Sequence, residues 1–211
     1  MRKGSGSARG RLIEAAVHEI RTRGYAGTSV EHLCQAAGVT KGAFFHHFDS
    51  KEALARAAVA WFQGRADELF ATAPYAALSD PVERVLGYVD LRIELIAGEL
   101  PAFTCLLGTI VQEAYETHPE LAAFCGSNMW GQMQGIATDI EAALASRGLA
   151  TQWDAMSLSQ HIQSVIQGAF VLAKARQDPK VAIECLRHLR RYVEMIFKGG
   201  EDDGRTGQKA D

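Results

Sequence analysis

The segment "AAGVTKGAFFHHF", residues Ala36–Phe48, predicts two short helices joined by a tight turn. Two alanines followed by Gly38 give the small residues and the left-handed conformation that such a turn requires. Thr40 can then cap a second short helix that runs through about His47. A steep crossing of two short helices is the helix-turn-helix arrangement, in which the second helix presents its first turn to the DNA major groove.

The phenylalanines of this segment fall on two faces of the predicted second helix. Phe44 and Phe48 are four residues apart, so they share a face, and we expect both in the core. Phe45 lies on the other side, with His46 and His47 toward solvent or DNA. Adjacent histidines on a helix point about 100° apart. Because no third ligand has suitable spacing, we predict no metal site here, while two solvated surface histidines remain an alternative to DNA contact.

The whole chain is predicted to be all-α, because no alternating β-branched runs occur and helix caps and stops are frequent. We expect about nine helices, with short ones before residue 48 and longer ones after it. Thr28 with Glu31 can form a capping box for the first helix of the motif. The predicted division is a helix-turn-helix domain with a basic arm over 1–55, a helical effector-binding and dimerisation domain over 56–198, and a disordered tail over 199–211.

Charge is unevenly distributed along the 211 residues. Residues 1–51 hold eight of the 22 Lys and Arg residues but only four of the 25 Asp and Glu residues, so the first quarter is basic and the remainder acidic. A basic end on an acidic body suits contact with a polyanion. The start of the chain shows no secretory signal, and no apolar run is long enough to span a membrane, so we expect a cytoplasmic protein.

No catalytic constellation emerges from the spacing of nucleophiles, acids and bases, so we expect no enzyme and no cofactor. The four cysteines, Cys34, Cys105, Cys125 and Cys185, lie far apart and include no CxxC pair. We expect reduced, mostly buried thiols rather than disulfides or a zinc site.

The segment "GYAGTSVEHLCQAAGVTKGAFFHHFDSKEALARAAV", residues 24–59, resembles the DNA-binding signature of the TetR/AcrR family of bacterial repressors. The resemblance implies a three-helix DNA-binding domain on a larger helical domain that binds ligands and dimerises. Many members carry Tyr where this chain has Phe45, which lacks a hydroxyl for phosphate. By position, the implied DNA-contacting residues are Thr28, Ser29, Thr40, Lys41, Gly42, Ala43, Phe45, His46, His47 and Lys51.

The resemblance also implies a function. A homodimer formed by the last two helices, roughly 157–176 and 181–197, would bind a palindromic double-stranded DNA operator and be released by a small-molecule inducer. Its activity as an activator, or as a thiol-based sensor of electrophiles or oxidants through Cys105, remains an alternative. The composition favours an apolar or aromatic effector. Candidate effector-binding residues are Tyr88, Arg92, Phe103, Cys105, Gln112, Met129, Trp130, Met133 and His161.

Overall fold

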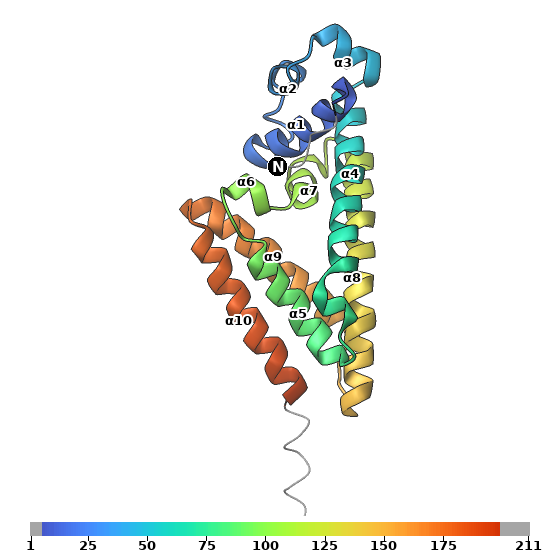
Figure 1. Ribbon diagram of the computed structural model, residues 1–211, viewed down its shortest axis with the longest axis vertical. Coiled ribbons are helices and arrows are strands. Elements are labelled where there is room, and N and C mark those ends of the chain that lie inside the picture. Colours follow the sequence, from blue (N-terminus) through green and yellow to red (C-terminus); the bar gives the residue numbers. More distant parts are fainter. Residues whose placement is uncertain (1–5, 199–211) are drawn as a thin grey trace, which may run out of the picture. The chain divides into compact units, whose positions relative to one another are not determined.

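The computed structural model describes residues 6–198 and is all-α over that range (Figure 1). The predicted tail at 199–211 and the first residues of the basic arm lie outside the described residues. A short 3-10 helix, η1 (Pro74–Ala77), follows α4. The α-helices are α1 (Ala8–Arg23), α2 (Val30–Ala37), α3 (Lys41–His47), α4 (Lys51–Thr72), α5 (Pro81–Glu94), α6 (Leu100–Phe103), α7 (Leu106–Ala114), α8 (Pro119–Arg147), α9 (Ala155–Arg176) and α10 (Pro179–Lys198).

Local capping explains the helix-turn-helix boundaries, with one correction to the predicted cap. The N-cap of α2 is Ser29 rather than Thr28, and its hydroxyl accepts the N–H of His32 while the His32 ring accepts the Ser29 N–H. His32 therefore occupies the capping-box position that we assigned to Glu31. At the other end Gly38 adopts φ 61°, a left-handed conformation that glycine reaches without steric cost.

A break separates two helices after residue 100, and the sequence pattern did not reveal it. Thr104 and Cys105 have extended backbone conformations, so α6 ends at Phe103 and α7 begins at Leu106. The Cys105 sulfur accepts the N–H of Gly108 and caps α7. Thiols are uncommon N-caps, which is why sequence patterns gave no signal for a helix start at this position.

One compact unit comprises the residues up to Leu69 together with Gly98–Trp130. Within it α1 packs against α2, α3, α6 and α7 (Figure 1). Leu12, Leu33, Phe44 and Leu54 share one core with Ile110 of α7. The three-helix motif therefore does not bury its apolar surface alone, because α7 and the beginning of α8 complete its core. The predicted domain boundary at residue 55 lies within α4 and remains a prediction.

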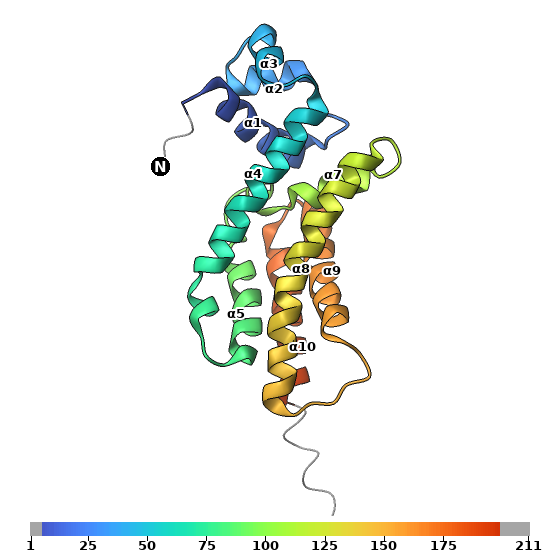
Figure 2. The same cartoon turned by 90° about the vertical axis from the view of Figure 1, so that its right-hand side faces the viewer.

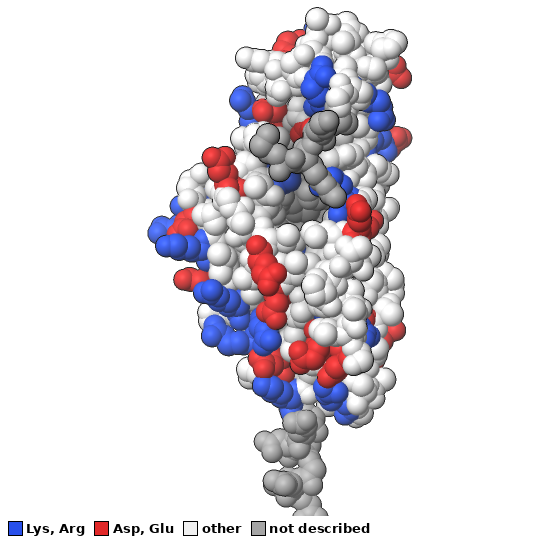
Figure 3. All heavy atoms as spheres, viewed as in Figure 1, with Lys and Arg blue, Asp and Glu red and all other residues white. Residues whose placement is uncertain are grey.

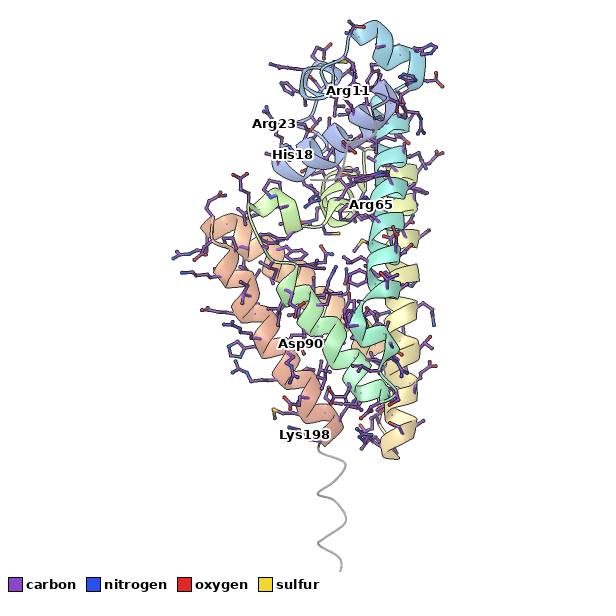
Figure 4. All side chains as sticks on the ribbon, in the orientation of Figure 1. Arg11, His18, Arg23, Arg65, Asp90 and Lys198 are labelled. Carbon is purple, nitrogen blue, oxygen red and sulfur yellow. The ribbon has the colours of Figure 1, made fainter. Side chains whose placement is uncertain are left out.

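The second compact unit comprises Phe70–Ala97 and the residues from Gly131 onward. Here α10 packs against both α9 and α5. In Figure 2, α5 and α9 appear on either side of α8. Arg190 of α10 pairs with Asp90 of α5 at 3.1 Å (Asp90 is labelled in Figure 4). Figure 3 shows basic and acidic side chains next to one another along α10. Among the described residues, none of the helices is long and apolar enough to cross a membrane.

Candidate nucleic-acid interface and effector-binding residues

The position of α3 is fixed by the two phenylalanines predicted to lie inside, and this prediction is confirmed. Phe44 is fully buried and Phe48 is nearly so, with their ring centroids 6.2 Å apart. The Arg9 guanidinium lies 5.3 Å from the Phe48 ring centroid. With this face buried, the opposite face of α3 must be directed outward.

The outward side chains of α3 form a continuous set that we call the α3 surface. It comprises Thr40, Lys41, Gly42, Phe45 and His46, all exposed. Phe45 is 50% exposed although it is a large apolar residue. Such an aromatic ring on a small polar surface costs solvation and suits a binding contact better than a role in the fold.

Two further predicted residues of this segment are only half-buried. They are Ala43 and His47, and the His47 ring stacks edge-on against His46 at 4.9 Å between centroids. Within residues 6–198 no group of three or more His, Cys, Asp or Glu side chains is placed to hold a metal ion. The two histidines therefore have each other, rather than a ligand set, as their nearest ring partners.

Gly42 is a feature of the α3 surface that internal packing does not explain. A Cβ added at this position would meet only the Thr40 hydroxyl, at 3.8 Å. Glycine within a helix costs about 0.5–1 kcal/mol relative to alanine. Because no neighbour inside the protein requires the missing side chain, its absence is useful for the close approach of an external surface.

Lys41 forms an ion pair with an acidic residue that was not among the predicted DNA contacts. Its ammonium donates to the Glu31 carboxylate at 2.7 Å. The hydrogen bond from Lys41 lowers the pKa of Glu31 to about 2 and raises the pKa of Lys41. Both side chains are exposed, so the pair adds little to stability and phosphate can compete with it for Lys41.

Three predicted DNA contacts have hydrogen-bond partners within the domain. Thr28 is 1% exposed and donates its hydroxyl to the Gly24 carbonyl, while Ser29 caps α2. Lys51 donates to the Tyr25 carbonyl at 3.0 Å and lies 4.2 Å from the Tyr25 ring centroid. Burial lowers the pKa of Lys51. The structure therefore places Thr28 inside the domain and gives Ser29 and Lys51 partners within it.

In the second unit, two predicted effector residues of α5 lie in one aromatic cluster. The Tyr88 ring is 5.4 Å from Phe70 and 6.3 Å from Tyr75 between centroids. The Arg92 guanidinium lies 5.3 Å from the Phe70 centroid, and its buried Nε atom has no hydrogen-bond partner. A cation held between aromatic faces inside a helical unit can bind a polar group of a largely apolar molecule.

Further buried polar atoms come from α9, and sequence reasoning missed them. The Ser159 hydroxyl donates to the carbonyl of Met133, a predicted effector residue that is itself buried. Gln163 and Gln167 follow at four-residue spacing, and the Gln163 Oε1 and Gln167 Nε2 atoms are buried without hydrogen-bond partners. Polar residues repeating every four positions on the inner face of a helix were the signal that could have identified them.

The other predicted effector residues lie outside the aromatic cluster around Tyr88 and Arg92. Three of them are exposed: Gln112, which bonds the Gly108 carbonyl of its own helix, Trp130, and His161, which stacks on Tyr192. These three side chains therefore lie at the surface, and their role in effector binding stays a prediction. The remaining three, Phe103, Cys105 and Met129, are half-buried in the first unit.

Known proteins share both the motif and the fold. Residues 12–58 match the family described as bacterial regulatory proteins, tetR family. The HTH-type transcriptional repressor DhaR of Mycobacterium sp. (strain GP1) is 31% identical over 102 residues, which cover 48% of this chain and 50% of DhaR. The chain thus matches about half the length of that relative.

Two other comparisons extend over most of the chain. The HTH-type transcriptional regulator EthR of Mycolicibacterium smegmatis is 25% identical over 173 residues, covering 82% of this chain and 77% of EthR. The crystal structure of a TetR transcriptional regulator from Chloroflexus aurantiacus J-10-FL has a TM-score of 0.77 and 26% identity, covering 92% of this chain and 97% of that chain. Residues 12–58 therefore carry the helix-turn-helix of the tetR family, and the all-helical body of the chain is similar to that of TetR transcriptional regulators.

Proposed function

We propose that the protein is a homodimeric repressor that binds a palindromic operator through the α3 surface. The observation that carries this proposal is the division of α3 into a buried Phe44–Phe48 face and an outward face of small, basic and aromatic residues. Thr40, Gly42 and Ala43 allow the first turn to approach base edges, and Lys41 supplies charge for a phosphate. Phe45 offers a sugar or thymine-methyl contact, and His46 and His47 flank it.

A face of α9 and α10 supports dimerisation in this proposal. Val171 and Leu172 of α9 and Tyr192 and Met195 of α10 are large apolar side chains that are about half exposed or more. A Cβ at Gly168 would meet nothing within 4 Å, so a second helix can approach closely there. Two copies joined through these helices would present two α3 surfaces to half-sites about 34–36 Å apart, or a multiple of that spacing.

The proposed inducer is a largely apolar or aromatic molecule that contacts the second unit. Tyr88, Arg92 and Met133 are the predicted residues retained for this role, with Phe70 and Gln163 added from the structure. An inducer acts only if it binds the conformation with wrongly spaced α3 surfaces more tightly than the DNA-binding one. The sign of regulation follows from the repressors among the relatives rather than from the site.

The test begins with selection of DNA fragments bound by the full-length protein and measurement of their affinity by fluorescence anisotropy at several salt concentrations. We expect K41A to weaken binding to the selected fragment and to reduce the salt dependence by about one phosphate contact. K180A, which removes an exposed lysine from α10, is the matched control and should bind as the parent does. Equal affinity of K41A and the parent would exclude the α3 surface, and retention of no fragment above random DNA would exclude the function.

A second candidate function, thiol sensing, is favoured by the surroundings of Cys105. This residue is half-buried at the N-cap of α7, where its sulfur accepts the N–H of Gly108. A thiol that is partly accessible to solvent can react with an electrophile, whereas a fully buried thiol is inert. Loss of operator binding after mild electrophile treatment in the parent, and not in C105S, is the result this candidate requires.

A further inference from the structure

Arg21 is a buried cation that the fold itself does not neutralise by hydrogen bonding. It lies on α1, is 8% exposed, and its Nε and Nη2 atoms have no hydrogen-bond partner. Its guanidinium carbon lies 5.3 Å from the ring centroid of Phe62. A buried guanidinium with donors unused is costly unless an acceptor satisfies it. Burial lowers the pKa of Arg21 to about 10, so the group remains charged at neutral pH.

The beginning of α7 lies beside this cation. Helix α1 packs against both α6 and α7, which are joined by Thr104 and by Cys105, the N-cap of α7. Thr104 precedes it, is 1% exposed, and has a hydroxyl without a hydrogen-bond partner. Apart from the Gly108 N–H, which the Cys105 sulfur accepts, the first-turn amides of α7 also point outward as donors. Unused donors of three kinds therefore occur on α1 and at the junction of α6 and α7, which pack against one another, and all of them suit an anion.

We propose that Arg21, Thr104 and the N-terminus of α7 bind the carboxylate of a small molecule. This site lies within the first unit and is separate from the inducer site proposed for the second unit. Its effect on DNA binding rests on the proposed function. A planar guanidinium matches a carboxylate with two parallel hydrogen bonds. The neighbouring Phe62 and the buried Leu107 favour an apolar body attached to that group. A single cation balances a monoanion, whereas a phosphate dianion would bring excess charge into a buried place.

The opposite end of α7 connects such a site to the helix-turn-helix. The Glu113 carboxylate of α7 accepts the backbone N–H of Ala26 at 2.9 Å, in the loop between α1 and α2. A Cβ at Gly24 would collide with the same Glu113 side chain, so the contact is close. Tyr25 lies between Gly24 and Ala26 in the same loop, and its ring packs edge-on against His118. A ligand that shifts the first turn of α7 therefore acts on a short, rigid helix whose other end holds the entry to α2.

The test measures ligand binding to the full-length protein without DNA. Octanoate and benzoate are the probes, octanol and benzyl alcohol are their uncharged counterparts, and inorganic phosphate represents other anions. Titration calorimetry is expected to detect the two carboxylates and not the alcohols or phosphate. R21M should weaken carboxylate binding by about tenfold or more, because charge-assisted hydrogen bonds are lost. Without ligand it should melt no lower than the parent, because the unsatisfied charge is gone.

Matched variants separate the site from general effects of charge. R23M removes the exposed neighbouring arginine of α1, labelled in Figure 4, and should bind carboxylates as the parent does. R21K keeps the charge without the planar pair of donors, so its affinity for carboxylates should lie between those of the parent and R21M. It replaces R21M in the test if R21M does not fold. Equal carboxylate binding by parent, R21M and R21K would overturn the proposal, as would stronger binding of phosphate or the absence of carboxylate binding.

A DNA-binding measurement distinguishes this proposal from the proposed function. R21M should bind the selected operator fragment as tightly as the parent, while octanoate or benzoate should weaken operator binding of the parent only. Failure of the parent to bind any selected DNA would remove the regulatory function and leave the calorimetric result on the carboxylate site standing. If octanoate and benzoate leave operator binding of the parent unchanged, as they should for R21M, the coupling through α7 is overturned.

Discussion

Replacing Phe44 by alanine tests the division of α3 into a buried and an outward face. Phe44 is 0% exposed, and its ring lies 5.1 Å from Phe45 and 6.2 Å from Phe48 between centroids. Transfer of a buried phenylalanine side chain is worth about 1.5–3 kcal/mol. The cavity left behind brings the expected loss in the free energy of unfolding to about 3–5 kcal/mol.

The matched variant is F45A, one residue along the same helix. Because Phe45 is already half exposed, we expect a loss of about 1 kcal/mol, from the smaller transferred area and the lost ring contact. The double variant should lose less than the sum of the two, by about 0.5–1.5 kcal/mol, because the Phe44–Phe45 ring pair is removed only once. F45A, unlike F44A, should weaken operator binding under conditions where both are folded.

Urea denaturation followed by circular dichroism measures these losses, at one protein concentration because dimerisation contributes to stability. The midpoint should shift while the slope stays constant, which separates lost stability from a change in the unfolded state. Equal destabilisation by F44A and F45A would refute the reasoning, since it would mean that α3 does not present two distinct faces. A loss below about 1 kcal/mol for F44A would refute the burial argument directly.

Three further predictions follow. Lys41 lowers the pKa of Glu31 to about 2, so Glu31 stays ionised at neutral pH and its attraction for Lys41 is lost only as pH falls toward 2. E31Q should therefore free Lys41 and raise operator affinity about two- to five-fold by anisotropy at pH 7. Burial raises the pKa of Cys125 to about 12, so this thiol should react slowly. When the folded protein is treated with iodoacetamide at neutral pH, peptide mass spectrometry should find half-buried Cys105 modified and Cys125 unmodified. Equal labelling of the two cysteines would contradict this prediction. M195E, at a side chain that is 71% exposed, should leave helicity unchanged and shift sedimentation from dimer to monomer.

Local interactions made the helix-turn-helix predictable from its residues. Gly38 terminates α2, Thr40 caps α3, and the four-residue spacing of Phe44 and Phe48 defines the inner face, all through contacts within a few residues. The exposed status of Lys41 follows from the same helical phase. These features need no knowledge of the rest of the chain, which is why the α3 surface could be assigned in advance.

Competition between local signals limited that prediction. Thr28 and Ser29 are both good caps one residue apart, and only the burial of Thr28 against the Gly24 carbonyl decides between them. Lys51 is predicted to contact phosphate, and the structure shows that its ammonium also contacts the carbonyl and ring of Tyr25, 26 residues away. The sequence spacing of residues carries no information on such long-range partners.

The sequence by itself therefore determined the helical class, the recognition helix and its two faces. Tertiary structure decided which polar groups are enclosed: Arg21 beside the start of α7, Gln163 on the inner face of α9, and Glu113 at the loop before α2. The physical reason is that helix formation and capping depend on neighbours three or four positions away. Burial of a charge depends instead on helices that meet only after the chain has folded.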